Sequence, residues 1–346
     1  MWLHICMKAI VYSDAGGPEV LTLTERPVPD PGPGEVRVQV HVSGVNPTDW
    51  KMRAGGVSEG ISEQVPNQDG AGVIDAVGPG VDAARVGERV WMWEAAWRRA
   101  DGTAQEYVVL PERQAVALPD RASFDLGAAL GIRALTAHRA LTVSEGGPGR
   151  LAPGVLVGKT VLVAGGAGAV GNAAIQLARW AGARVITTVS GPRKAELAEA
   201  AGAHHVVNYR TDDAAVVIRE IAPHGVDIIV EVAPAVNAAL DHAVAAPNAV
   251  IAFYDINGGL DFTFPIWVAM RANVRWQGIF VYTIPETAKD DAIAGVCAAI
   301  ADGALRVGED AGLPLHRFPI ERTGEAHAAV ENDAVGKILI DVTPSP

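Results

Sequence analysis

Cysteine is nearly absent from this chain, which has only Cys6 and Cys297 among its 346 residues. Disulfide frameworks and zinc lobes need several cysteines at close spacing, whereas these two lie near opposite ends of the sequence. The composition therefore excludes a disulfide-stabilised scaffold and a cysteine-bound structural zinc. The nine histidines are scattered without a metal-binding spacing, and we predict no metal site.

Long apolar runs and a surplus of positive charge are also missing. No run reaches the roughly 20 residues of a membrane-spanning helix, and residues 1–6 are too short for a signal peptide. With 40 acidic against 28 basic residues the net charge is −12, which argues against nucleic acid because such binding depends on Lys and Arg. We expect a soluble, cytoplasmic protein that acts on a small molecule, with residues 1–6 as an extension before a natural start at Met7.

What the chain does have is enough apolar sequence, 49% of its residues, to fill two domains. Residues 7–118 show short strand patterns broken by Gly and Pro, with strict alternation in E-V-R-V-Q-V-H-V at residues 35–42, which predicts a small, partly open β-barrel. Further along, helix and strand patterns alternate, which is typical of a doubly wound parallel sheet. A last strand in residues 337–342 could return to the first domain.

We therefore place the domain boundaries so that residues 1–130 and 284–346 form the first domain and residues 131–283 form the second. A helical period over residues 124–141 predicts the helix that leads into the second domain. A Gly- and Pro-rich stretch at residues 145–158 predicts a flexible surface loop.

A glycine-rich turn follows an apolar run at residues 160–171, T-V-L-V-A-G-G-A-G-A-V-G. The run is typical of a buried parallel strand, and the residues after the turn have helical periodicity. In such a unit the glycines allow the turn, bring the backbone to a pyrophosphate and let helix and strand pack closely. A structural turn without a ligand is the alternative. The cofactor contacts that we predict here are Gly166, Ala167, Gly168, Ala169 and Val170.

The end of the next strand, at residues 184–189, distinguishes NADPH from NADH. An NAD site usually has Asp or Glu there, about 20 residues past the glycines, to hold the ribose 2′-hydroxyl. This chain has Ser190, then Arg193 and Lys194, and no carboxylate between them. A hydroxyl and two cations suit a 2′-phosphate, so we predict NADPH. The alternative is that both cations belong to a solvated first helical turn.

The chain resembles the medium-chain dehydrogenase/reductase superfamily, and within it the zeta-crystallin-type quinone oxidoreductases. The motifs that carry the resemblance run nearly from end to end: M-K-A-I-V-Y-S-D-A-G-G-P-E-V-L, V-N-P-T-D-W-K, A-L-T-A-H-R-A-L, A-G-G-A-G-A-V-G, A-G-A-H-H-V-V-N-Y-R and G-K-I-L-I-D-V. The resemblance implies a GroES-like, partly open β-barrel catalytic domain and a Rossmann domain. It also implies an NADPH-dependent reductase that passes a hydride to a quinone or another conjugated carbonyl.

The resemblance also implies that the chain works without zinc. Zinc-dependent members have Cys where this chain has Asn46, and a His-Glu pair where it has Gln68 and Asp69. A hydrogen-bond donor could instead stabilise the charge that develops on the acceptor oxygen. Asn46 is our first candidate for that donor, with Thr48 and Lys51 as further candidates; the alternative for Asn46 is a turn residue before Pro47.

The same resemblance assigns the rest of the cofactor site. It implies that Thr136 meets the nicotinamide carboxamide, that Ser190, Lys194 and Tyr209 hold the 2′-phosphate, and that Lys337 closes the site. The carboxyl ends of the parallel strands add Val232 to the predicted site. The residues expected at the nicotinamide end are Phe253, Tyr254, Phe280 and Val281. For Phe253 and Phe280, ordinary core packing remains an alternative.

The sequence departs from the family at several of these positions. Trp50 and Lys51 stand where a Tyr is common, and Arg133 and His138 flank A-L-T-A where the family usually has Pro and Tyr. Two other functions stay open: a 2-enoyl-thioester reductase, and a non-catalytic, crystallin-like NADPH-binding protein. We also expect a homodimer, formed by an exposed sheet edge at residues 279–283.

Overall fold

The computed structural model describes residues 6–343 and divides the chain into two compact units. The first unit is Met1–Ile132 with Leu315–Pro346, and the second is Arg133–Pro314. The division near residue 132 lies close to the predicted one. The second division lies at residue 314, whereas the sequence led us to expect it at residue 283.

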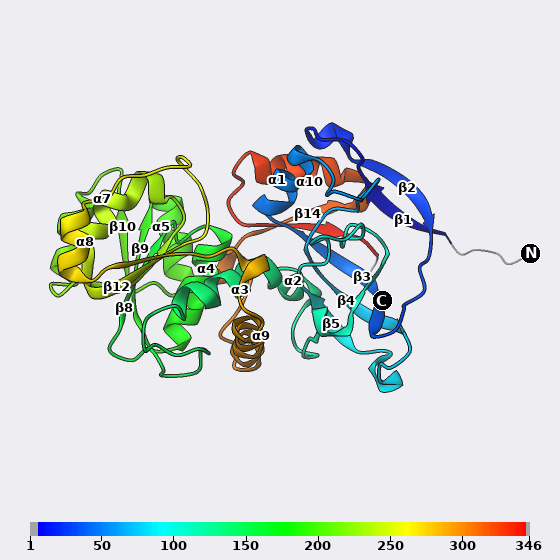
Figure 1. Ribbon diagram of the computed structural model, residues 1–346, viewed down its shortest axis with the longest axis horizontal. Coiled ribbons are helices and arrows are strands. Elements are labelled where there is room, and N and C mark those ends of the chain that lie inside the picture. The colour runs from blue at the N-terminus through cyan, green and yellow to red at the C-terminus, as the bar shows by residue number, and fades with distance from the viewer. Residues whose placement is uncertain (1–5, 344–346) are drawn as a thin grey trace, which may run out of the picture. The chain divides into compact units, whose positions relative to one another are not determined.

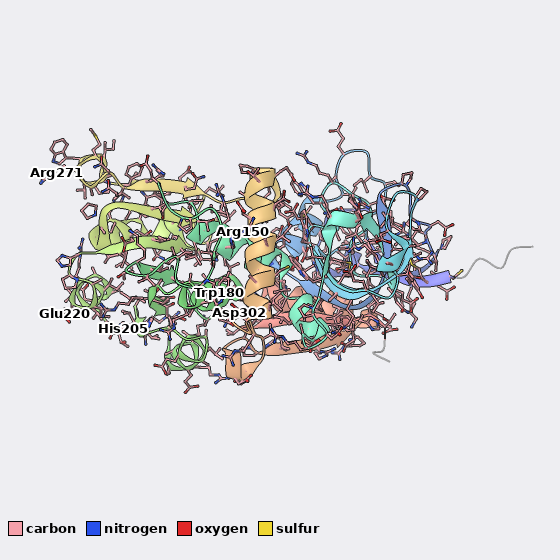
Figure 2. All side chains as sticks on the ribbon, turned by 90° about the horizontal axis from the view of Figure 1, so that it is seen from below. Arg150, Trp180, His205, Glu220, Arg271 and Asp302 are labelled. Carbon is pink, nitrogen blue, oxygen red and sulfur yellow. The ribbon has the colours of Figure 1, made fainter. Side chains whose placement is uncertain are left out.

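Residues 284–314 stay with the second unit because their polar groups bond to its loop at residue 150 and to its helix α4 (Ala169–Trp180). Arg150 pairs with Asp291 at 2.7 Å, and the Asn172 side chain donates to the Ala311 carbonyl at 2.8 Å. Figure 2 shows Arg150 beside the long helix α9 (Glu286–Ala301). Only with β14 (Leu315–Pro319) does the chain join the sheet of the first unit.

The first unit is the predicted partly open β-barrel. Its main sheet has the order β14-β15-β3-β4-β5-β7, β6 pairs with β3, and β1 and β2 form a separate antiparallel pair (Figure 1). The remaining strands are β1 (Cys6–Val11), β2 (Thr22–Pro27), β3 (Glu35–Val45), β4 (Asp69–Val77), β5 (Arg89–Met92), β6 (Tyr107–Pro111), β7 (Ala115–Ala117) and β15 (Lys337–Asp341). Because β15 pairs with β3, the predicted return of the last strand is confirmed.

Alternation along β3 builds the core of this barrel. Val36, Val38 and Val40 are all fully buried, as expected of one face of a strand. The helices of the unit are α1 (Pro47–Gly55), α2 (Phe124–Gly127) and α10 (Thr323–Glu331), and α1 contacts α10. Cys6, which we expected to lie in an extension, is the first residue of β1 and pairs with Pro27; residues 1–5 lie outside the described range.

The second unit is the predicted doubly wound sheet, with six parallel strands in the order β10-β9-β8-β11-β12-β13. These are β8 (Thr160–Ala164), β9 (Arg184–Val189), β10 (His205–Asn208), β11 (Val226–Glu231), β12 (Ala245–Phe253) and β13 (Arg275–Gly278). Its further helices are α3 (Gly131–Leu141), α4 (Ala169–Trp180), α5 (Pro192–Ala200), α6 (Ala214–Ile221), α7 (Pro234–Val244) and α8 (Ile266–Ala272). The strand order reverses between β8 and β11, where such sheets bind their ligands.

Three local expectations were wrong. The predicted helix over residues 124–141 is two helices, α2 and α3, separated near Ala128. The loop at residues 145–158 is not wholly superficial, because Leu151 and Leu156 are buried and the Leu151 N–H donates to His138 Nε2. The sheet edge is β13, and residues 279–283 follow it as a turn that ends in a short 3-10 helix.

Within the described residues, no helix is both long and apolar enough to cross a membrane.

Candidate active site

The glycine turn between β8 and α4 has the shape that a pyrophosphate site requires. A Cβ on Gly166 would lie 2.1 Å from Thr187 Oγ1, and one on Gly171 would lie 2.5 Å from the Gly165 carbonyl oxygen. Close packing therefore demands glycine at both positions. Gly168 is the N-cap of α4 and no side chain caps this helix start. The first backbone N–H groups of α4 remain available to phosphate oxygens, which is the kind of contact that we predict for residues 166–170.

The two cations after β9 differ in what surrounds them. Arg193 is exposed and pairs with Glu196 at 3.0 Å and also with Glu309. Lys194, in the first turn of α5, is half-buried and has no hydrogen bond or ion pair within residues 6–343. Both cations are predicted contacts of the 2′-phosphate. Among the described residues the Lys194 ammonium has no ion-pair partner and could bind an anion, whereas Arg193 forms ion pairs with two carboxylates.

Other predicted cofactor residues lie at the same end of the parallel sheet. The Tyr209 N–H donates to the Val189 carbonyl at 3.2 Å, which brings Tyr209 beside the end of β9, and its side chain is 52% exposed. Val232 directly follows β11, and its Cγ1 would lie 3.3 Å from a Cβ on Gly165. Val232 therefore borders the glycine turn. Thr136 is a buried residue of α3.

A pocket of about 460 Å³ opens in the second unit after β12 and β13. Three residues predicted for the nicotinamide end, Phe253, Tyr254 and Phe280, line it together. Val281 is buried in the 3-10 turn that follows and is not part of the lining. The lining also includes Arg139 and Asp255, which the sequence did not mark as site residues.

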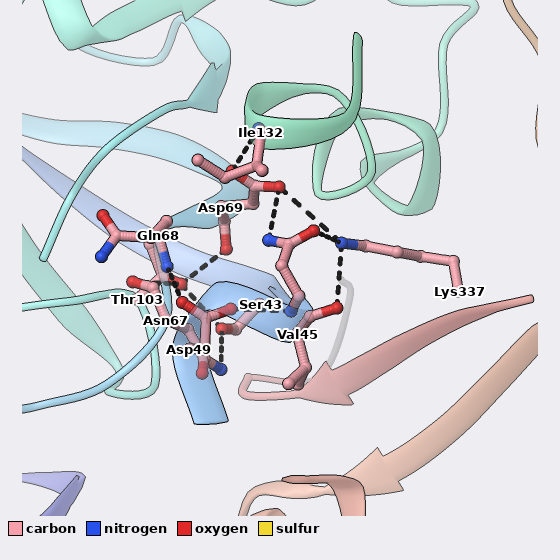
Figure 3. A network of polar contacts seen from close by, with 10 residues as sticks. Ser43, Val45, Asp49, Asn67, Gln68, Asp69, Thr103, Ile132 and Lys337 are labelled. Carbon is pink, nitrogen blue, oxygen red and sulfur yellow. Dashed lines mark hydrogen bonds and ion pairs between the residues drawn. The ribbon is translucent and has the colours of Figure 1, made fainter. Parts of the chain in front are cut away.

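In the first unit, Asn46 is the centre of a buried polar cluster that consists of Asn46, Asp49, Asp69 and Lys337. Figure 3 shows Asp49, Asp69 and Lys337 of this cluster. Its Nδ2 donates to Asp69 Oδ2 at 2.8 Å, and its Oδ1 accepts from Lys337 Nζ at 2.7 Å. A carboxylate can only accept and an ammonium can only donate, so these neighbours fix which end of the amide is which. The cluster holds the Asn46 side chain in a single orientation.

Asn46 is also the N-cap of α1, with Asp49 at position N3. Asp49 Oδ2 accepts the Asn46 N–H at 2.7 Å, and Oδ1 accepts the Gln68 N–H at 3.1 Å. Burial, together with the nearby charge of Asp69, raises the pKa of Asp49 to about 7. Asn46 therefore has two roles. Its backbone is the N-cap of α1, which agrees with the alternative of a turn residue before Pro47, and its side chain belongs to the cluster.

Lys337, which we expect to close the cofactor site, is a buried residue of the first unit. Its side chain is only 2% exposed, and its ammonium donates to the Val45 carbonyl at 3.1 Å and lies 3.7 Å from Asp69 Oδ2. The contacts shown by the structure therefore tie it to Asn46 and Asp69. An ammonium at this position also repels a divalent cation, and amides replace the thiolate and imidazole that zinc prefers.

Further buried polar residues contact the cluster through Asp69. Thr103 Oγ1 donates to the Asp69 carbonyl at 2.6 Å and lies 2.7 Å from Ser43 Oγ. Asn67 donates to Ser43 Oγ and accepts from His327 Nε2, each at 2.9 Å. Burial, together with the nearby Arg53, lowers the pKa of His327 to about 3, so this histidine is a neutral donor.

Two predicted catalytic candidates lie outside this cluster. Thr48 and Lys51 are half-buried residues of α1, and the Lys51 ammonium lies 5.9 Å from the Trp50 ring centre. Sequence reasoning did not identify Asp49 as a member of the cluster, although Asn46 and Asp49 have the spacing of a capping box. Arg139 and Asp255 gave no sequence signal, because loop and helix positions that line a pocket follow no motif.

Comparisons with known proteins agree with this architecture. The family model "Alcohol dehydrogenase GroES-like domain" matches residues 32–120, and "Zinc-binding dehydrogenase" matches residues 169–295. The human protein named quinone oxidoreductase is 29% identical over 339 residues, which cover 96% of this chain and 97% of that protein.

Solved structures show the same fold with both kinds of cofactor in their titles. A mycobacterial protein complexed with NADPH is 29% identical with a TM-score of 0.80, covering 96% of this chain and 99% of the other. A protein titled NAD-dependent alcohol dehydrogenase is also 29% identical, with a TM-score of 0.84 and coverage of 97% and 100%. The fold alone therefore does not choose between NADPH and NADH.

The zinc-ligand positions do distinguish the branches of this fold. At two positions where zinc enzymes have metal ligands this chain has the amides Asn46 and Gln68, and the GroES-like family model matches the residues around both. The Lys337 ammonium, which donates to Asn46 Oδ1, further disfavours a metal ion there. The chain accordingly belongs to the medium-chain dehydrogenase/reductase superfamily of oxidoreductases, as a zinc-independent member of the quinone oxidoreductase type.

Proposed function

We propose that this protein is an NADPH-dependent reductase that passes a hydride to a quinone or a related conjugated carbonyl compound. The observation that carries the cofactor choice is the end of β9, where Ser190 and the unpaired Lys194 stand without a carboxylate between them. A carboxylate there would repel a 2′-phosphate, and an ammonium attracts it. The choice of a quinone as the acceptor is based on the similarity to the human protein named quinone oxidoreductase.

Different residues of the chain bind different parts of NADPH. The N-terminus of α4 receives the pyrophosphate, Ser190, Lys194 and Tyr209 receive the 2′-phosphate, and Thr136 orients the nicotinamide carboxamide. NADPH supplies the hydride when bound, so the protein contributes orientation and electrostatics. The aromatic walls of the pocket, from Phe253 and Phe280, keep water away from the reacting ring.

Asn46 is our candidate for the polar group that assists the acceptor. Its amide nitrogen carries two hydrogens and uses one of them for Asp69. Within residues 6–343 the second hydrogen has no partner, and Lys337 and Asp69 hold its direction. A preoriented donor stabilises an oxygen that gains negative charge. Thr48 and Lys51 remain further candidates.

The test measures NADPH and NADH oxidation with 9,10-phenanthrenequinone, with crotonyl-CoA and with no acceptor. Lys194→Ala and Arg193→Ala form a matched pair, because each removes one cation from neighbouring positions of α5. We expect the wild type to prefer NADPH. Lys194→Ala should raise the Kd for NADPH about tenfold and leave NADH unaffected, since it removes one charge-assisted contact. Arg193→Ala should change the Kd for NADPH less, because Arg193 already forms ion pairs with Glu196 and Glu309.

Other outcomes point to the alternatives. Oxidation with crotonyl-CoA in place of the quinone would identify a 2-enoyl-thioester reductase. Tight NADPH binding without oxidation by any acceptor would favour a non-catalytic NADPH-binding protein. Equal effects of the two substitutions would contradict the assignment of Lys194 as the main phosphate contact.

We also propose a homodimer that pairs along β13, the exposed edge of the parallel sheet. The neighbouring helix α8 exposes Ile266, Trp267 and Met270, each more than 60% accessible, beside this edge. Such an apolar surface is typical of an interface. Light scattering at micromolar concentration should give twice the mass of the chain, and Trp267→Glu should shift it toward the monomer.

A further inference from the structure

Arg139 is a charged residue of the second unit's pocket that an uncharged quinone leaves unexplained. It lies on α3 and lines the pocket, half-buried. Within residues 6–343 its guanidinium has no hydrogen bond and no ion pair, and burial lowers its pKa. A partly desolvated guanidinium without a counter-charge is unfavourable, because burial penalises a charge that nothing compensates.

The rest of the lining does not neutralise Arg139. Ile256, Ile279, Ile284 and Pro285 are apolar, and Gln277 is neutral. Asp255, the other charged residue of the lining, accepts the Ile256 N–H at 2.8 Å. In the described part of the chain no ion pair joins Asp255 to Arg139. The pocket therefore contains a guanidinium that no ion pair neutralises within residues 6–343, in largely apolar surroundings.

The spacing along α3 places this charge next to the expected nicotinamide end. Thr136, our candidate for the carboxamide contact, and Arg139 are three residues apart in α3. Residues at this spacing share a helix face, one turn apart along the axis. Arg139 thus lies about one helical turn from the residue that we expect to meet the nicotinamide carboxamide.

We propose that this pocket takes an acceptor that carries an anionic oxygen group, a carboxylate or a sulfonate, and that Arg139 is its ion-pair partner. The proposal rests on the proposed function and names the substrate class within it. A guanidinium donates two parallel N–H groups to such an anion, which gives orientation as well as attraction. The pocket volume of about 460 Å³ is within the range of small-molecule sites.

The chain's net charge of −12 does not contradict an anionic ligand. Exposed charges more than about 8–10 Å away are screened at physiological ionic strength, whereas a partly buried partner within contact distance is screened much less. Local complementarity therefore decides binding in the pocket. High salt should weaken it only moderately.

Binding is tested first without turnover, by calorimetry on the full chain with naphthalene-2-sulfonate and with its neutral analogue naphthalene-2-sulfonamide. We expect the sulfonate to bind more tightly. Arg139→Met should raise the Kd for the sulfonate about tenfold and leave the Kd for the sulfonamide little changed, because the substitution removes only the charge-assisted contact. Arg139→Lys should keep part of the preference for the sulfonate over the sulfonamide. Equal affinity of wild type and Arg139→Met for the sulfonate would overturn the proposal.

Arg271→Met is the matched control. It removes one positive charge from the same unit, and Arg271 is an exposed residue of α8 on the side of the unit away from α9 (Figure 2). Within the described residues its side chain has no hydrogen bond or ion pair. Binding of naphthalene-2-sulfonate should be the same in this variant as in the wild type. An equal loss in both variants would mean that overall charge, rather than the pocket, attracts the anion, and would contradict the proposal.

A second arm measures turnover with 1,2-naphthoquinone and with 1,2-naphthoquinone-4-sulfonate. The ratio of their kcat/KM values should fall about tenfold in Arg139→Met, chiefly through KM for the sulfonate. If neither quinone is reduced but Arg139-dependent sulfonate binding persists, the proposed function fails and the anion site stands. If both are reduced and the ratio stays constant, the function stands and the role of Arg139 fails.

Discussion

Each unit of this protein buries a pair of carboxyl groups, and the two pairs differ in what neutralises them. Asp49 and Asp69 of the first unit are 2% and 0% exposed, and Glu231 and Asp241 of the second are 0% and 1% exposed. The first pair has the Lys337 ammonium 3.7 Å from Asp69. Within residues 6–343 the second pair has no ion-pair partner.

The second pair lies at the carboxyl end of β11 and on α7. Glu231 Oε1 accepts the Ala233 N–H and the Asn237 side chain, the latter at 3.0 Å. Its other oxygen and both oxygens of Asp241 have no donor in the described structure. Burial raises the pKa of Glu231, and burial with the charge of Glu231 raises the pKa of Asp241 well above its usual value.

The difference shows two ways to keep acids inside a protein. In the first unit a cation and several N–H donors surround the acids, and the pKa of Asp49 rises only to about 7. In the second unit no cation pairs with Glu231 or Asp241 among the described residues, so a proton shared between the two carboxyl groups neutralises them. The first arrangement depends on one lysine, and the second depends on pH.

The largest expected effect comes from removing the lysine. Lys337→Met keeps the length of an unbranched side chain but leaves Asp69 without its cation and Asn46 Oδ1 without its donor. Breaking a buried ion pair on one side costs about 3–5 kcal/mol, because the remaining charge stays buried and unpaired. Urea denaturation followed by tryptophan fluorescence at pH 7 should show this loss in the free energy of unfolding.

Lys8→Met is the control for that experiment. Lys8 pairs with Glu321 at 2.7 Å, but both side chains are about half exposed, so water replaces the partner. Its effect on stability should be far smaller than that of Lys337→Met. Similar losses in the two variants would show that the buried cluster depends less on its cation than the contacts indicate.

Much of this architecture follows from local sequence patterns. The alternation in residues 35–42 and the glycine turn at residues 160–171 identified β3 and the β8–α4 unit because one face or one turn determines each of them. The helix break near Ala128 and the true sheet edge at β13 did not follow, since tertiary packing decides where a helix ends and which strand lies outermost.

The candidate sites divide in the same way. Gly166 and Lys194 belong to motifs with fixed spacing, so the sequence identified them. The cluster around Asn46 joins residues 46, 69 and 337, whose proximity depends on the pairing of β15 with β3. Arg139 faces its pocket through packing of α3 against loops that no motif describes. Local sequence patterns therefore identify the residues of a motif, whereas long-range strand pairing determines which other residues these side chains contact.

A smaller and opposite effect is expected in the second unit. Because the folded pKa values of Glu231 and Asp241 are raised, the folded state holds a proton that the unfolded chain releases above about pH 4. Stability from this pair is fully present below the unfolded pKa and is lost as pH rises through the folded pKa. The slope for one proton is at most about 1.4 kcal/mol per pH unit.

Asp241→Asn should flatten this decline, because an amide donates to Glu231 at any pH and needs no shared proton. The free energies of unfolding of variant and wild type, measured by urea denaturation between pH 5 and 9, should diverge in favour of the variant as pH rises. Asp49 also titrates in this range, but it does so in both proteins and cancels in the difference. A difference that is constant with pH would mean that Glu231 and Asp241 share no proton. The contrast between the two units, a cation in one and a shared proton in the other, would then disappear.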